Sequence, residues 1–194
     1  IPSPASKTDV SDNLNDWNLT PSIKNWAIDW TKYWKPGEVG AHLRLNQFLN
    51  SHLNGYGQMR DHPGQKGTSR LSAHLRFGEI SPRQILRTAN DFVTGKPALS
   101  EDKSKFLSEI GWREFSYHLL YHFPFITQKN LRPEFDNYPW RDSTKDLQSW
   151  QEGKTGYPLV DAGMRELWKT GYMHNRVRMI VASFLVKHLR INWR

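Results

Sequence analysis

The chain has 194 residues, 37% of them hydrophobic and nine of them tryptophans, which suits one domain with a substantial core. Its formal net charge is +8, and its lack of cysteine excludes disulfides and thiolate metal sites and suits a reducing compartment such as the cytoplasm. Because no run of 18 apolar residues occurs, we predict no membrane span and expect no membrane among the partners. We also predict no metal site.

Residues 1–20 are polar and contain proline and serine, so we predict an interdomain linker there and one helical domain over 21–194. Thr20 and Pro21 are typical of a helix start. Since the sequence begins with Ile1 and has no signal-peptide pattern, we expect it to be cut from a longer reading frame.

The apolar spacing and the breaker residues predict an all-α fold. Helices are expected over 21–33, 38–53, 72–77, 82–93, 103–121, 146–152, 158–170 and 173–189. The stretches 55–67 and 131–144 are predicted to be loops. No alternating pattern longer than four residues indicates a strand.

The glycine-rich loop before the third helix has the parts of a phosphate site. Gly64 and Gly67 would let the backbone approach a ligand, and Arg70 would supply charge. Hydroxyl groups come from Thr68, Ser69 and Ser72. A capped helix after a flexible loop is the alternative interpretation.

In the helix predicted over 103–121, one narrow arc carries four side chains that suit a nucleobase: Glu109, Trp112, Arg113 and Ser116. A carboxylate, an indole and a guanidinium facing together favour a pocket for a base flipped out of a duplex. An amphipathic helix with one exposed tryptophan and an intrahelical ion pair would give the same pattern.

The segment 173–189 is apolar nearly all round, which predicts a buried helix. Its start is polar, with His174, Asn175, Arg176 and Arg178, so we expect an anionic ligand near its N-terminus. An ordinary buried helix whose arginines reach water is the alternative. Residues 165–194 carry seven basic side chains against Glu166 alone, which suits a phosphate backbone as partner.

Four motifs in register identify a family. Residues 67–72 (GTSRLS), 112–115 (WREF), 153–165 (GKTGYPLVDAGMR) and 174–176 (HNR) resemble the FAD-binding domain of DNA photolyases and cryptochromes. The resemblance covers almost the whole chain and is closest to class I photolyases, which repair cyclobutane pyrimidine dimers. It implies a light-driven lyase in which reduced FAD donates an electron to a dimer in DNA.

The resemblance also implies the rival functions. A cryptochrome, which is a blue-light photoreceptor, has the same scaffold. Repair of (6-4) photoproducts is disfavoured because Asn175 stands where that branch typically has histidine. From a different class, the chain could be a helical nucleic-acid-binding or scaffold module without flavin.

The resemblance assigns a role to each candidate residue. Catalytic roles fall to Glu109 (base contact), Trp112 (stacking on the dimer) and Asn175. FAD contacts fall to Tyr56, Thr68, Ser69, Arg70, Leu71, Ser72, Phe106, Arg113, Asn175 and Arg178, with the diphosphate at 68–72. DNA contacts fall to Arg60, Glu109, Trp112, Arg113, Ser116, Asn175, Arg176 and Met179, and electron transfer to Trp140 and Trp193.

In the family, an antenna domain precedes this region, and a segment that closes the flavin cavity follows it. Neither is found in the 194 residues, so we expect a domain incomplete at the C-terminus with weak or undetectable FAD binding. Arg178 should then lack the aspartate that it pairs with, which is costly at a buried site. The sequence indicates no particular antenna pigment. We expect a monomer whose partner is DNA containing pyrimidine dimers.

Overall fold

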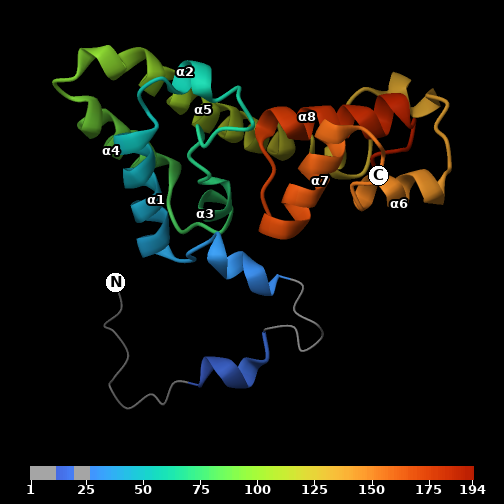
Figure 1. The fold of residues 1–194 in the computed structure, drawn as a ribbon, viewed down its shortest axis with the longest axis horizontal. Helices are drawn as coiled ribbons and strands as arrows, with labels where there is room; N and C mark the ends of the chain where they lie inside the picture. Colours follow the sequence, from blue (N-terminus) through green and yellow to red (C-terminus); the bar gives the residue numbers. More distant parts are fainter. Residues whose placement is uncertain (1–11, 20–26) are drawn as a thin grey trace.

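The computed structural model describes residues 12–19 and 27–194, and every regular element in these ranges is helical (Figure 1). The all-α prediction is therefore confirmed. The main elements are α1 (Glu38–Ser51), α2 (Tyr56–Met59), α3 (Ser72–Arg76), α4 (Pro82–Val93), α5 (Ser100–His122), α6 (Thr144–Gln151), α7 (Pro158–Thr170) and α8 (Asn175–Ser183). Short 3₁₀ turns are η1 (Leu14–Trp17), η2 (Ile28–Lys32), η3 (Pro97–Leu99), η4 (Pro124–Thr127) and η5 (Pro133–Asn137).

Near the N-terminus only part of the prediction can be compared with the structure. The turn η1 lies inside the predicted linker, and the described end of the predicted helix 21–33 is the short turn η2 rather than an α-helix. The predicted helix start at Thr20 and Pro21 lies outside the described residues. The boundary between linker and domain stays a prediction.

The helices form two groups, each with its own apolar core, and Figure 1 shows α1 to α4 toward one end and α6 to α8 toward the other. In the first core the rings of Phe48, Tyr56 and Phe106 pack together, with Phe48 and Phe106 centroids 4.6 Å apart. The second core joins α7 and α8 through Val160, Met164, Met173, Val177, Val181 and Phe184. None of the helices in the described ranges is long and apolar enough to cross a membrane.

Local signals explain several helix ends. Ser81 accepts from the backbone N–H of Gln84, whose side chain accepts from the N–H of Ser81, so α4 begins with a complete capping box. The α7 helix ends at Gly171, whose φ of +69° suits glycine. A Cβ atom there would also lie 3.0 Å from the Trp30 ring.

The predicted helix 173–189 is corrected in two respects. The α8 helix begins at Asn175, because the side chain of His174 accepts from the Arg176 N–H as a cap, and the last turn, η6 (Phe184–His188), is π-helical. Burial is also one-sided, since Met179 and Ile180 are 57% and 42% exposed. The apolar run is therefore a half-buried helix and not one enclosed on all sides.

Close packing of α7 on α8 depends on Gly163. A Cβ atom at this position would lie 2.4 Å from Val177 Cγ1 and 3.2 Å from Val181 Cγ2. Neither valine can yield freely, because both are buried.

We therefore expect Gly163→Ala to lower the free energy of unfolding by about 1–3 kcal/mol, the usual cost of overpacking a core. Gly111→Ala is the matched control, since Gly111 also lies inside a helix but has no atom within 4 Å of its Cβ position. Its stability should rise by up to about 1 kcal/mol from helix propensity. Urea unfolding of both variants measures the difference, and a Gly163→Ala protein as stable as Gly111→Ala would contradict the tight α7–α8 contact.

Candidate functional site

The turn that carries two of the predicted site residues is fixed to α5 by one carboxylate. Asp102, in the first turn of α5, accepts hydrogen bonds from the backbone N–H groups of Gly55 (2.8 Å) and Gly57 (2.7 Å). Gly55 has a φ of +79°, a conformation that suits glycine. Because α5 begins three residues before its predicted start, Asp102 lies within the helix and can hold the N-terminus of α2.

The predicted flavin contacts Tyr56 and Phe106 are side chains of the first core. They are 5% and 1% exposed, and their ring centroids lie 5.8 Å apart in an edge-on contact. Burial raises the pKa of the Tyr56 hydroxyl to about 12, so it remains protonated at neutral pH. Leu71 is also buried, at 2% exposure.

Beside this core lies a small cationic cavity, which we call the anion recess. Its volume is about 170 Å³, and it is lined by Arg44, Gln47, Phe48, His52, Lys66, Thr68, Ser69 and Arg70. Burial, together with the charge of Arg70, lowers the pKa of Arg44. Like charges gathered without a lining carboxylate are relieved by a bound anion. Sequence reasoning found Thr68, Ser69 and Arg70 but missed Arg44 and Lys66, which no local pattern marks.

The structure gives one of the two loop glycines a packing role that was not predicted, and the predicted approach of their backbone to a ligand stays a prediction. A Cβ atom at Gly67 would lie 2.7 Å from the carbonyl oxygen of Met59, so this glycine allows the loop to pack on its own backbone. Gly64 has open space around its Cβ position. Ser72 begins α3 and is exposed, and it does not line the anion recess.

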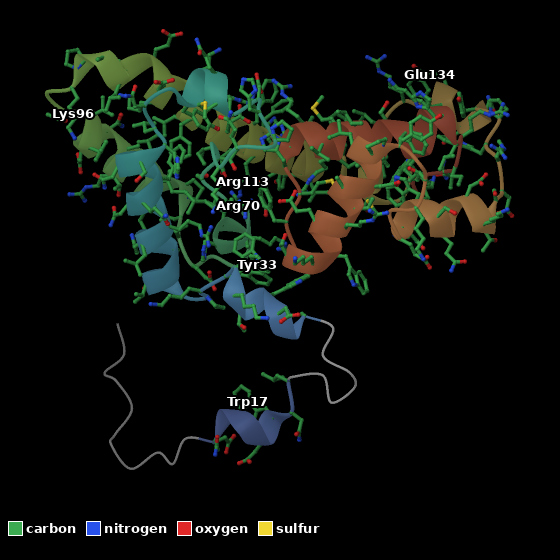
Figure 2. All side chains as sticks on the ribbon, in the orientation of Figure 1. Trp17, Tyr33, Arg70, Lys96, Arg113 and Glu134 are labelled. Atoms are coloured by element: carbon green, nitrogen blue, oxygen red, sulfur yellow. The ribbon has the colours of Figure 1, made fainter. Side chains whose placement is uncertain are left out.

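Arg70 is held in place by two residues that the sequence analysis missed. Its guanidinium lies 4.4 Å from the ring centroid of Tyr172, and its Nη2 lies 3.5 Å from Glu166 Oε1. The Tyr172 hydroxyl in turn is 3.0 Å from Thr68 Oγ1. Arg70 also adopts a left-handed backbone, with φ of +52°, which is uncommon for a residue other than glycine. Figure 2 shows Arg70 and Arg113 in the central part of the molecule.

Three predicted residues from distant segments meet through a fourth that was not predicted. Arg60 Nη1 lies 2.5 Å from Glu109 Oε1, and Arg176 Nε lies 2.7 Å from Asp61 Oδ1. The same Asp61 oxygen is 3.7 Å from Arg60 Nε. We call Arg60, Asp61, Glu109 and Arg176 the arginine cluster. The hydrogen bond from Arg176 holds the pKa of Asp61 below its usual value, so the Asp61 carboxylate is ionised at neutral pH.

The predicted base-facing arc on α5 is only partly formed. Trp112 is 63% exposed and meets Phe115 edge-on, with ring centroids 5.9 Å apart. The Ser116 hydroxyl donates to the Trp112 carbonyl, so its proton is used inside the helix. Glu109 pairs with Arg60, and not with Arg113 one turn away. Trp112 is exposed and Arg113 pairs with Glu114 in the same helix, as the amphipathic alternative requires, so the base pocket stays a prediction.

Arg113 is tied to its surroundings by three contacts. It forms an ion pair with Glu114, donates through Nη2 to the Leu75 carbonyl at 3.2 Å, and lies 4.6 Å from the centroid of the Tyr117 ring. The bond to Leu75 connects α5 with the end of α3. Arg113 therefore connects the base-facing arc, to which it belongs, with the helix that follows the anion recess.

At the start of α8, burial lowers the pKa of His174, which favours its neutral ring, and Nδ1 of that ring accepts from the Arg176 N–H at 3.2 Å. Asn175 is exposed. Arg178 is exposed as well and donates to the Met173 carbonyl at 3.4 Å, so the predicted buried arginine without a partner is corrected. Met179 lines a separate apolar groove of about 630 Å³ with Tyr157 and Phe184.

The two tryptophans predicted to transfer electrons lie together, away from the anion recess. Trp140 and Trp193 line one cavity of about 280 Å³, which also contains Tyr138. The rings of Tyr138 and Trp140 are 4.7 Å apart, and Trp193 Nε1 donates to Asn130 at 2.9 Å. Their electron-transfer role stays a prediction.

Comparison with known proteins supplies the family. Residues 106–194 match the model of the FAD binding domain of DNA photolyase. A deoxyribodipyrimidine photo-lyase of Agrobacterium fabrum is 50% identical over 184 residues, which are 95% of this chain and 38% of that protein. Cryptochrome-2 of Arabidopsis thaliana is 40% identical over 169 residues, 84% of this chain and 28% of that protein.

A solved structure agrees with the sequence matches. The crystal structure of a bacterial class III photolyase from Agrobacterium tumefaciens superposes with a TM-score of 0.91 at 49% identity, over 97% of this chain and 39% of that one. The motifs favour class I, whereas this structure is described as class III. The chain spans less than two fifths of the length of these relatives. Its motifs, its helical fold and these matches together show that it belongs to the DNA photolyase and cryptochrome family and has the fold of the family's FAD-binding domain.

Proposed function

We propose that the protein repairs cyclobutane pyrimidine dimers in DNA with light, using FAD. The observation that carries the proposal is the arginine cluster, in which Arg60, Glu109 and Arg176 meet from three distant segments one helical turn from the exposed ring of Trp112. Two guanidinium groups suit backbone phosphates, and the carboxylate with the indole suits a flipped base. The photo-lyases among the relatives support this reading.

The anion recess fits the diphosphate of FAD. Its cations and hydroxyl groups come from Arg44, Lys66, Thr68, Ser69 and Arg70, and no carboxylate lines it. When bound, FAD supplies the light absorption and the electron that splits the dimer. The protein's own residues bind and orient: the recess holds the diphosphate, and the arginine cluster with Trp112 positions the DNA lesion. We further propose that the protein acts as a monomer in the cytoplasm.

A cryptochrome function is the second candidate, because cryptochromes of two plants are 40% identical to this chain. Illumination of dimer-containing DNA with the protein, expressed from its complete reading frame and supplied with FAD, separates the two. A repair enzyme restores the pyrimidines only in the light. Flavin binding without light-dependent repair would favour the photoreceptor, and a protein that binds DNA but no flavin would favour a flavin-free module.

For the anion recess, we predict that Arg70→Ala, in the protein expressed from its complete reading frame, weakens FAD binding by roughly 10-fold to 150-fold. The lost charge-assisted hydrogen bond is worth about 1.5–3 kcal/mol, and each 1.4 kcal/mol is a factor of ten. Titration with FAD, followed by flavin fluorescence, measures the change. Arg83→Ala, at an exposed arginine of α4, is the control. Equal FAD affinity in the two variants would remove Arg70 from the site.

For the base pocket, we predict that Trp112→Ala weakens binding of dimer-containing DNA far more than binding of undamaged DNA. Stacking of a base on an aromatic ring is worth about 1–3 kcal/mol, and only a flipped base reaches the ring. Tyr121→Ala is the matched control, because Tyr121 lies on the same helix and is 82% exposed. If Trp112→Ala reduces the affinity for both DNAs by the same factor, Trp112 is not the stacking residue.

A further inference from the structure

Asp61 lies between the two arginines to which the proposed function assigns DNA phosphate. Its Oδ1 atom is 2.7 Å from Arg176 Nε and 3.7 Å from Arg60 Nε, so one carboxylate oxygen faces both guanidinium groups. Nothing in the local sequence around Asp61 predicts this, since Arg176 is 115 residues away along the chain.

The carboxylate is held at this position by the backbone. The Asp61 N–H donates to the Gln58 carbonyl at 3.2 Å, and the next residue, His62, donates to Met59 at 3.1 Å. Both bonds continue the α2 turn, which Asp102 fixes to α5. The turn therefore fixes the backbone of Asp61 beside α5, and the ion pairs with Arg176 and Arg60 orient its carboxylate.

The arginine cluster carries no net charge. Arg60 and Arg176 supply two positive charges, and Asp61 and Glu109 supply two negative ones. The side chains of Asp61 and Arg176 are 46% and 45% exposed, so a solvated anion can reach the pair. A phosphate oxygen makes the same charge-assisted bonds to a guanidinium as a carboxylate oxygen does.

We propose that Asp61 is an internal competitor of DNA phosphate, which occupies Arg176 and approaches Arg60 until a backbone phosphate replaces it. This inference rests on the proposed function. It makes Asp61 a residue that lowers backbone affinity, so that less protein is retained on undamaged DNA and the contacts to the flipped base decide where the protein stays.

The test is binding of two duplex oligonucleotides, one with a cyclobutane dimer and one without, at several salt concentrations, to the protein expressed from its complete reading frame. Asp61→Asn should bind both duplexes up to about 8-fold more tightly at 0.1 M salt, with a salt dependence steeper by roughly one phosphate contact. Asp91→Asn is the matched control, because it removes a carboxylate from an exposed ion pair with Arg87 on α4 and changes the net charge equally.

A double variant shows whether the gain passes through the named arginine. If it does, the double variant Asp61→Asn with Arg176→Ala should bind DNA no more tightly than Arg176→Ala alone, so the gain in affinity disappears. Thermal unfolding of each variant verifies that the fold is retained. Conversely, if Asp61→Asn binds DNA no better than the parent, or more weakly, the carboxylate positions the arginines and the competitor role is wrong.

DNA binding by the parent protein distinguishes failure of the proposed function from failure of the role proposed for Asp61. If it binds neither duplex, the proposed function fails and the role of Asp61 fails with it. If the parent prefers the damaged duplex while Asp61→Asn and Asp91→Asn raise its affinity by the same factor, only the inference about Asp61 fails.

Discussion

The hydrogen bonds from Gly55 and Gly57 to the Asp102 carboxylate are the constraint on which the candidate site depends. They fix the short α2 turn against α5, where a Cβ atom at Gly57 would lie 3.1 Å from Asp102 Oδ1. With the turn fixed, Tyr56 enters the first core, and Arg60 reaches Glu109, two turns along α5 from Asp102. The position of α2 along α5 is therefore set by the hydrogen bonds to Asp102 and by the packing of the Tyr56 ring on Phe106.

The site lies where the two groups of helices meet, and the bonds across that meeting are mostly polar. Arg176 of α8 bonds to Asp61, Tyr172 bonds to Thr68, and Trp34 Nε1 donates to the Thr170 carbonyl at 2.6 Å. Of these contacts, the ion pair of Arg176 with Asp61 is exposed and therefore stabilises weakly, whereas the apolar cores lie within each group. An anion bound by residues of both groups would stabilise the native state by mass action and would fix their relative position.

The sequence predicted the helices well where a local signal marks both ends. For α7, Pro158 begins the helix and Gly171 ends it, and the predicted bounds agree with the structure. It failed at 173–189, because hydrophobic spacing shows neither the His174 cap nor the change to a π-turn at Phe184. The motifs put Thr68 and Arg70 among the candidates, and both line the anion recess, whereas no motif pointed to Asp61, Glu166 or Tyr172. Their roles come from contacts between distant segments, which no short pattern encodes.

The net charge of a segment also fails to show which of its basic side chains are paired with carboxylates in the fold. The basic excess of residues 165–194 suggested a strong field for phosphate, yet the fold brings Asp61 to Arg176 and Asp136 to Arg194. The anion recess differs, since its lining includes Arg44, Lys66 and Arg70 and no carboxylate, and the charge of Arg70 contributes to the lowered pKa of Arg44. The fold thus treats its arginines in two ways: in the anion recess Arg44 and Lys66 have no lining carboxylate and Arg70 has only Glu166 outside the lining, whereas in the arginine cluster two carboxylates balance two guanidinium groups.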